Sequence, residues 1–387
     1  MIDYNPNRIV LMRRLEKMSQ AKLSEKTGYS TATLSRLQNS IIQFDEKTAR
    51  KIAYAVDYPI SFFSKSDEPM PPTRLTYRRT SKTSISEINA VAAEYEILSS
   101  TVQRVANEAA IKPHLSWLDR IAPRKSTALT IDDINRIAVS ARKYLGIPSN
   151  KPIGNVTRIL EHAGIVITPM HSNGEKSNSS TTSEGVTCPE YTGAVPVLGY
   201  LNRENTGDRL RFTKAHEFGH LVLHRFRKEL NKKQKEKEAH QFAGAFLIPE
   251  TAIRPAIDEY STLSLFVNLK AEWGVSIAAL IMRASALNII NAQRERSLQI
   301  QLSVRGWKKH EPVEVEVEHP VLFKQMMGKV FGRILSPTEV EINSLTASHD
   351  LGVPFRFLDL WADGLTEDTE QLGIKGIRFP RPESDSI

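Results

Sequence analysis

Hydrophobic residues recur at helical spacing along most of this chain. Between residues 85 and 111, for example, apolar side chains stand three or four positions apart, which predicts one long helix. Strand patterns are short: an apolar run begins at Ile165, another covers 193–201, and strict alternation is confined to Val313–Glu318. The pattern therefore predicts a mainly α-helical protein with a small β-sheet, an α+β fold.

The first 66 residues carry the start and stop signals of several short helices. Ser19 can cap the second helix, and Gly28 makes the turn that follows it. Ser30 and Asp45 can cap the third and fourth helices. Two short helices joined by a turn of three or four residues have the geometry of a helix-turn-helix DNA reader. The alternative is a small helical bundle that serves only dimerisation or protein docking.

Prolines and changes of composition divide the rest of the chain. The helix at 85–111 would follow a basic linker, and it would hold the reader away from the catalytic part or pair with its copy in a dimer. Near the C-terminus we expect helices at 338–345 and 355–361, and a disordered end from 380. The expected units are a helix-turn-helix domain, a linker with its spacer helix, a catalytic domain and an α/β region, at 1–66, 67–120, 121–305 and 306–387.

The charge balance predicts an acidic partner. The 387-residue chain has a net charge of +8, and its first 66 residues hold 11 Lys/Arg against 6 Asp/Glu. Double-stranded DNA is the acidic partner that such a basic segment favours. The single cysteine, Cys188, excludes disulfides within the chain and a cysteine-based zinc site. No apolar run approaches the length of a membrane span, so we expect a soluble, cytoplasmic protein without membrane contact.

Residues 216–220 read His-Glu-Phe-Gly-His inside an apolar stretch that is compatible with a helix. Two histidines four positions apart lie about 40° from each other around a helix, so both rings can bind one metal ion. The glutamate beside the first histidine, Glu217, can take a proton from a metal-bound water. The alternative is a buried helix whose histidines only form hydrogen bonds. The apolar residues that follow, Leu221–Leu223, favour a rigid metal site instead.

A catalytic zinc also needs a third protein ligand. The metzincin spacing is excluded because Leu223 and Phe226 stand at its glycine and histidine positions. His224 lies a full turn further along the helix and is better suited to capping its end. The next expected helix has an apolar stripe with Glu238 on one border and His240 on the other. A side chain on such a border can reach inward to a metal held by a facing helix.

Several stretches accompany the HExxH run: Gly207–His224, Glu238–Ala243, Leu247–Pro249 and Leu269–Ala284. In combination they resemble the ImmA/IrrE family of metallopeptidases, over about residues 130 to 310. The resemblance implies a Zn²⁺ ion and these site residues: His216, His220 and Glu238 as metal ligands, with Glu217 as the general base. His240 differs from the family, which usually has asparagine after the Glu-Ala pair.

The N-terminal patterns Ser19-Gln20-x-x-Leu23 and Gly28-Tyr-Ser30-x-x-x-Leu34-Ser35-Arg36 resemble the XRE (lambda-repressor-like) family. Short hydroxyl side chains suit phosphate and base-edge contacts, and arginine can read guanine. Such readers usually bind DNA as homodimers. The usual Glu-x-Gly after the reading helix is Gln38-Asn39-Ser40 in this chain. The resemblance implies that the following residues face DNA: Gln20, Ser30, Thr31, Thr33, Ser35 and Arg36.

The leading hypothesis is a DNA-binding regulator fused to a zinc endopeptidase that cleaves a protein partner, such as a repressor or a toxin. The alternative is an antitoxin-like or phage-type repressor whose zincin domain binds a partner without turnover. Intact HExxH together with Glu238 favours an enzyme, because docking has no need of Glu217.

Three further expectations concern the surroundings of the site. An extended substrate would bind by sheet extension at the strand 193–201. A polar loop at 171–185 and the tail beyond residue 310 are the two features able to gate the site. Candidates for stabilising an oxyanion, by position in the sequence alone, are Tyr191, Arg209 and His240.

Overall fold

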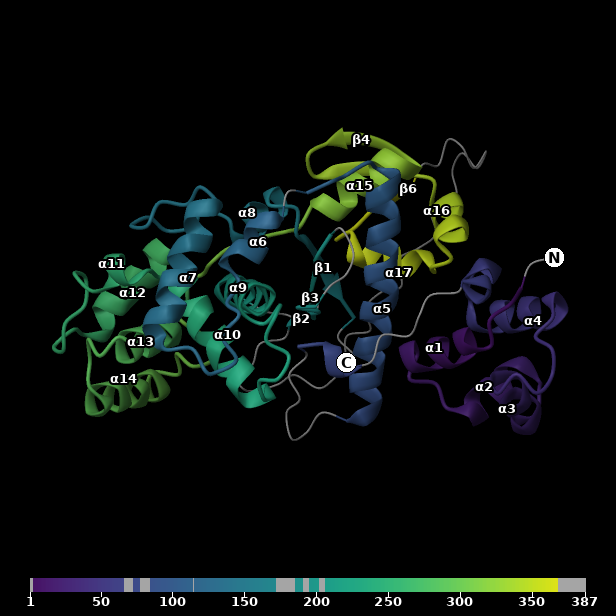
Figure 1. Ribbon diagram of the computed structural model, residues 1–387, viewed down its shortest axis with the longest axis horizontal. Helices are drawn as coiled ribbons and strands as arrows, with labels where there is room; N and C mark the ends of the chain where they lie inside the picture. The colour runs from purple at the N-terminus through teal and green to yellow at the C-terminus, as the bar shows by residue number, and fades with distance from the viewer. Residues whose placement is uncertain are drawn as a thin grey trace.

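The computed structural model describes residues 3–65, 72–76, 84–113, 115–171, 185–190, 195–201 and 206–367. These parts are mainly helical and carry two small sheets, which confirms the expected α+β class. In Figure 1 the N-terminal helices lie at one end of the molecule and the helices around the HExxH motif lie at the other. A long helix and the C-terminal elements stand between these two ends.

The N-terminal helices begin and end where their local signals predict. The side chains of Ser19, Ser30 and Asp45 each accept a hydrogen bond from a backbone N–H in the first turn of the helix that follows. Gly28 adopts a left-handed conformation with φ 68° between the second and third helices. The elements are α1 (Asn7–Leu15), α2 (Gln20–Thr27), α3 (Thr31–Gln38), α4 (Glu46–Val56) and the 3-10 helix η1 (Ile60–Ser64).

The expected spacer helix is α5 (Ile85–Glu108), and it is a core element of the molecule. The side chains of Val91, Tyr95, Leu98 and Val102 are buried inside this one chain. They belong to a hydrophobic core that the N-terminal helices, the sheet and the C-terminal region share. The apolar face of α5 is therefore already covered within the chain.

A second hydrophobic core lies under the helices that surround the HExxH motif. Thr130 and Asp133 form the predicted capping box at the start of one of these helices. The elements are α6 (Ser116–Ile121), α7 (Ile131–Tyr144), α8 (Val156–His162), α9 (Gly207–Leu223), α10 (Lys232–Leu247), α11 (Glu250–Ile253), α12 (Leu263–Trp273), α13 (Ile277–Ala286) and α14 (Ala292–Val304).

The sheet beside α9 has strand order β1-β3-β2. Its strands are β1 (Val166–Met170), β2 (Gly185–Thr187) and β3 (Val197–Leu201). β3 is parallel to β1 and antiparallel to β2. The expectation that the strand just before α9 offers its edge to a substrate is wrong, because β3 is hydrogen-bonded on both sides. The outer edge of this sheet beside α9 belongs to β2.

The C-terminal region packs on α5 and on the N-terminal helices. Ser61 donates a hydrogen bond to the carbonyl oxygen of His349, and Lys65 donates one to that of Asp350. Residues after 321 share their hydrophobic core with α1 and α5. The elements here are α15 (Leu322–Phe331), β4 (Gly332–Ser336), β5 (Glu339–Ile342), α16 (Ser344–Leu351), α17 (Phe355–Trp361) and β6 (Thr366–Glu367).

The helix expected at 355–361 is confirmed, but two other expectations for this region are wrong. Residues 338–345 form β5 and only the start of α16. The alternating stretch Val313–Glu318 forms no strand. Its backbone instead lies so close to α9 that a Cβ atom on Gly207 would be 2.1 Å from the carbonyl oxygen of Glu316. Its apolar side is not buried, because Val313 and Val315 are half-buried and Val317 is exposed, whereas Glu318 on the polar side is buried. No second strand lies beside this segment among the described residues.

Within the described ranges no single helix is long and apolar enough to cross a membrane. One bent pair, α12 with α13, passes that test by length and composition only.

Candidate metal centre

The HExxH motif lies on α9, the most deeply buried helix of the second core. The relative exposures of His216, Glu217 and His220 are 3%, 1% and 1%. Apolar neighbours on both sides of the motif, including Phe218 and Leu221, are fully buried. Neighbouring elements therefore enclose most of this helix, and the polar residues of the motif are shielded from solvent.

The two histidines of the motif converge with a carboxylate from α10. The Nε2 atoms of His216 and His220 lie 3.2 Å apart. The two carboxylate oxygens of Glu236 lie 3.6 Å from these nitrogens, Oε2 from His216 and Oε1 from His220. These three residues form the one His/Cys/Asp/Glu cluster with metal-ligand spacing in the described part of the chain.

This donor set fits a zinc ion. Ligand atoms at the usual zinc distances of about 2.0–2.1 Å stand about 3.3 Å apart in a tetrahedral site, close to the separations seen here. Oε2 of Glu236 is buried, and it has no hydrogen-bond partner among the described residues. Burial and the neighbouring His224 and His216 lower the pKa of His220 well below its usual value. A neutral imidazole is the form that binds a metal.

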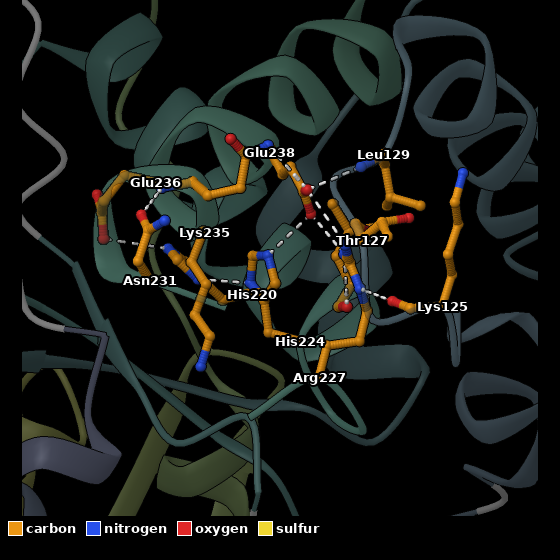
Figure 2. A network of polar contacts seen from close by, with 12 residues as sticks. Lys125, Thr127, Leu129, His220, His224, Arg227, Asn231, Lys235, Glu236 and Glu238 are labelled. Atoms are coloured by element: carbon orange, nitrogen blue, oxygen red, sulfur yellow. Dashed lines mark hydrogen bonds and ion pairs between the residues drawn. The ribbon is translucent and has the colours of Figure 1, made fainter. Parts of the chain in front are cut away.

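The third ligand expected from the resemblance, Glu238, is not part of this cluster. Its carboxylate is fully buried and paired with the guanidinium of Arg227, which donates to both of its oxygens. It also accepts hydrogen bonds from the backbone N–H of Leu129 and from the side chain of Gln234, each at 3.0 Å. Figure 2 shows Glu236 turned toward His220, while Glu238 is turned toward Arg227.

Glu236 and Glu238 face different neighbours for a geometric reason. Residues two apart on a helix are rotated by about 200° from each other, so they cannot face the same neighbour. In the sequence, Glu236 stands among lysines and has the pattern of a solvated acid. Only the docking of α10 against α9 turns it toward His216 and His220.

Glu238 instead supports the centre through His224, which follows the last turn of α9. Nδ1 of His224 lies 2.9 Å from Nδ1 of His220, and Nε2 of His224 lies 3.4 Å from Oε2 of Glu238. Burial alone would raise the pKa of Glu238, but the nearby His224 and hydrogen bonds from Arg227 hold it well below its usual range. The ionised carboxylate favours a proton on Nε2 of His224. Nδ1 of His224 then accepts from His220, whose Nε2 lone pair is left facing Glu236.

The expected general base, Glu217, lies against the sheet. Its Oε2 accepts a hydrogen bond of 2.6 Å from the hydroxyl of Thr76. A Cβ atom on Gly185 would lie 2.3 Å from Cγ of Glu217, so the glycine allows β2 to approach α9 closely. The carboxylate is therefore held between α9 and the start of β2.

Cavities open on both sides of the metal-binding cluster. The larger, about 660 Å³, is lined by His216, Glu236 and His240 among others. The smaller, about 230 Å³, is lined by His220 and Glu236 and by residues 73–76. A peptide chain passing the cluster would have room on both sides of it.

The residues expected around the site have different places. The His240 ring lies 4.9 Å from that of Phe212, which puts it on the wall of the larger cavity. Tyr191 and the loop residues 172–184 lie outside the described residues. No described residue beyond 310 lines either cavity. The structure thus gives no support to a gate formed by the described part of the tail.

The comparisons with known proteins agree with the centre at family level. Residues 160–285 match the family model of the IrrE N-terminal-like domain, Peptidase_M78. This stretch includes α9 and α10, and with them every residue of the cluster. The match supports the ImmA/IrrE part of the resemblance. A search of curated proteins found no match to the chain.

Four of the residues expected to face DNA lie where the start of α2 meets the start of α3. The side chain of Gln20 donates to the backbone oxygen of Thr31, which ties the start of α2 to the start of α3. Ser30 caps α3 and also lies 2.9 Å from the hydroxyl of Thr33. Ser35 is half-buried and Arg36 is exposed. In Figure 1, α2 and α3 lie beyond α1, away from α5.

Proposed function

We propose that this protein is a zinc-dependent endopeptidase that cleaves a protein partner, joined to an N-terminal DNA reader. The peptidase part of this proposal is supported by one observation: His216, His220 and Glu236 converge, and Glu217 is buried beside the first histidine. A site built only for docking has no need of a second carboxylate that is held apart from the first. The family match at 160–285 agrees with this half.

Each residue of the centre has a role in peptide hydrolysis. His216, His220 and Glu236 would hold the ion, which when bound lowers the pKa of a water molecule and polarises a peptide carbonyl. Glu217 takes a proton on its carboxylate from the attacking water and passes it to the leaving amine. His224, Glu238 and Arg227 keep the His220 ring in its orientation and tautomer. The two cavities receive the peptide on either side of the scissile bond.

The reader half rests on the helix-turn-helix geometry and on charge. The N-terminal helices have the short turn at Gly28 that such readers use, and their basic excess favours a polyanion. We propose that the start of α3 contacts duplex DNA and that the protein acts as a homodimer on an inverted repeat. The substrate would then be a regulatory protein, such as a repressor or a toxin, that meets the peptidase near its operator.

The metal content of purified variants tests the peptidase half. We expect about one zinc per chain in the parent protein, and loss of zinc in His216→Ala and Glu236→Ala. Glu217→Gln should keep the zinc and lose turnover of a partner encoded near this gene. If the parent protein binds zinc, and the Glu217→Gln variant supports the same biological response as the parent, the site binds a partner without cleaving it. Absence of zinc from the parent would remove the proposal altogether.

A further inference from the structure

Residues 73–76 line the smaller cavity beside the cluster of His216, His220 and Glu236. We refer to them as the strap. The strap follows the N-terminal helices in the sequence, yet its residues line the same 230 Å³ cavity as His220 and Glu236. Leu75 is buried in the first hydrophobic core, which anchors the strap at the site.

The strap uses the hydrogen-bonding groups that β2 presents at its outer edge. The backbone N–H of Thr76 donates to the carbonyl oxygen of Thr187 at 3.0 Å. The backbone N–H of Thr187 donates to the hydroxyl of Thr76 at 2.8 Å. The guanidinium of Arg74 donates to the carbonyl oxygen of Glu190 at 2.9 Å. Pairing of this kind, along the edge of a sheet, is a common way for proteins to bind a peptide.

The same threonine also engages the general base. The Thr76 hydroxyl has one hydrogen, and its shortest contact as a donor is the 2.6 Å bond to Oε2 of Glu217. A linker has no structural need to place a hydroxyl on a buried catalytic carboxylate. The contact engages the oxygen that must accept a proton during hydrolysis. The strap therefore lies where a substrate has to bind.

We propose that the outer edge of β2 binds an extended protein segment with an apolar residue followed by a hydroxyl residue, and that the strap occupies this site in cis until substrate displaces it. The inference rests on the proposed peptidase function. Leu75 and Thr76 supply the preferred pair: the apolar side chain is buried beside the sheet, and the hydroxyl bridges Thr187 and Glu217. Because the strap is tethered, its effective concentration is on the order of millimolar, so a free peptide competes poorly with it.

The test compares Thr76→Val with Thr73→Val in the full chain. Both substitutions remove a hydroxyl from the strap, but Thr73 is exposed. Loss of a hydrogen bond to a charged group should weaken the strap by about tenfold or more. We expect amide exchange at residue 76, whose backbone N–H donates to the carbonyl oxygen of Thr187, to rise by about that factor in Thr76→Val and to stay unchanged in Thr73→Val. Circular dichroism and zinc content check that both variants are folded.

A fluorescein-labelled synthetic peptide with the sequence of residues 72–78 reports on the vacated edge. We expect about tenfold tighter binding to Thr76→Val than to the parent, and no such gain when valine replaces the threonine in the peptide. Unchanged amide exchange at residue 76 and unchanged peptide affinity in Thr76→Val would overturn the proposal. Both readouts are independent of turnover. If the variant binds the peptide while zinc or cleavage is absent from every form, the binding edge stands and the peptidase function fails.

Discussion

The opposite roles of Glu236 and Glu238 give the most direct test of the centre. The two residues are separated by one position on α10, yet one faces the histidines of the HExxH motif and the other faces Arg227. We predict that Glu236→Ala abolishes zinc binding with little effect on the metal-free fold. Glu238→Ala should weaken zinc binding less, because Glu238 acts on His220 only through His224, and it should cause a large loss of stability even without metal.

The magnitudes follow from burial. The side chains of Glu238 and Arg227 are both 0% exposed, so removing the carboxylate leaves a buried cation without its counter-charge. Breaking such a pair costs about 3–5 kcal/mol of unfolding free energy. The Glu236 side chain is 15% exposed, and its Oε2 accepts no hydrogen bond from a described residue. Its removal should change the metal-free stability by less than about 1 kcal/mol.

The assay is urea denaturation of EDTA-treated protein, followed by zinc titration against a chelating dye at the same protein concentration. Removing a residue that only hydrogen-bonds to a ligand can lower metal affinity by about 100-fold. Glu236→Ala removes a ligand itself, so its zinc affinity should fall by more than that. Glu236→Gln and Glu238→Gln are matched controls that keep side-chain volume. If Glu238→Ala unfolds like the parent and loses zinc, while Glu236→Ala retains it, the assignment of ligands is reversed.

Three further predictions address other parts of the molecule. His224→Ala should lower zinc affinity by about 10–100-fold in the same titration, because it removes the partner that orients His220. Gly185→Ala should retain zinc but lose activity, and it should destabilise the fold by about 1–3 kcal/mol in urea, since its Cβ atom collides with Glu217. Arg36→Ala should weaken operator binding by about 1–3 kcal/mol in a gel-shift titration if it reads a base, and a preserved affinity would count against α3 as the reading helix.

Features set by neighbours in the sequence could be predicted from it. The caps at Ser19, Ser30 and Asp45 and the capping box at Thr130 depend on side chains within three residues of the N–H groups they satisfy. The helical spacing of apolar residues was also enough to predict the long helix α5. It did not reveal that α5 is buried inside the chain, because burial depends on what packs around it.

Extended segments were harder to interpret because a strand needs a partner. Val313–Glu318 alternates as a strand should, but it has no strand partner among the described residues, and the residue it buries is Glu318 from the polar side of the pattern, which contacts α8 and α9. That carboxylate accepts from the backbone N–H groups of Val156 and Thr157 and pairs with Arg211. In β3 the pattern correctly gave a strand, yet its central place in the sheet depended on β1 and β2. Strand order is a property of the tertiary fold.

One part of the candidate site could be predicted from local sequence, and the other part depends on how the helices pack. His216 and His220 lie on one turn of one helix, so their spacing alone brings both rings to one point, and the sequence by itself determined that half of the site. Glu236 reaches them only because α10 docks on α9 in one rotation, and two positions further along the same helix the side chain points elsewhere. Thr76 meets Glu217 across 141 positions of sequence. Such contacts arise from the packing of whole elements, which no local pattern records, and the tertiary structure decided them.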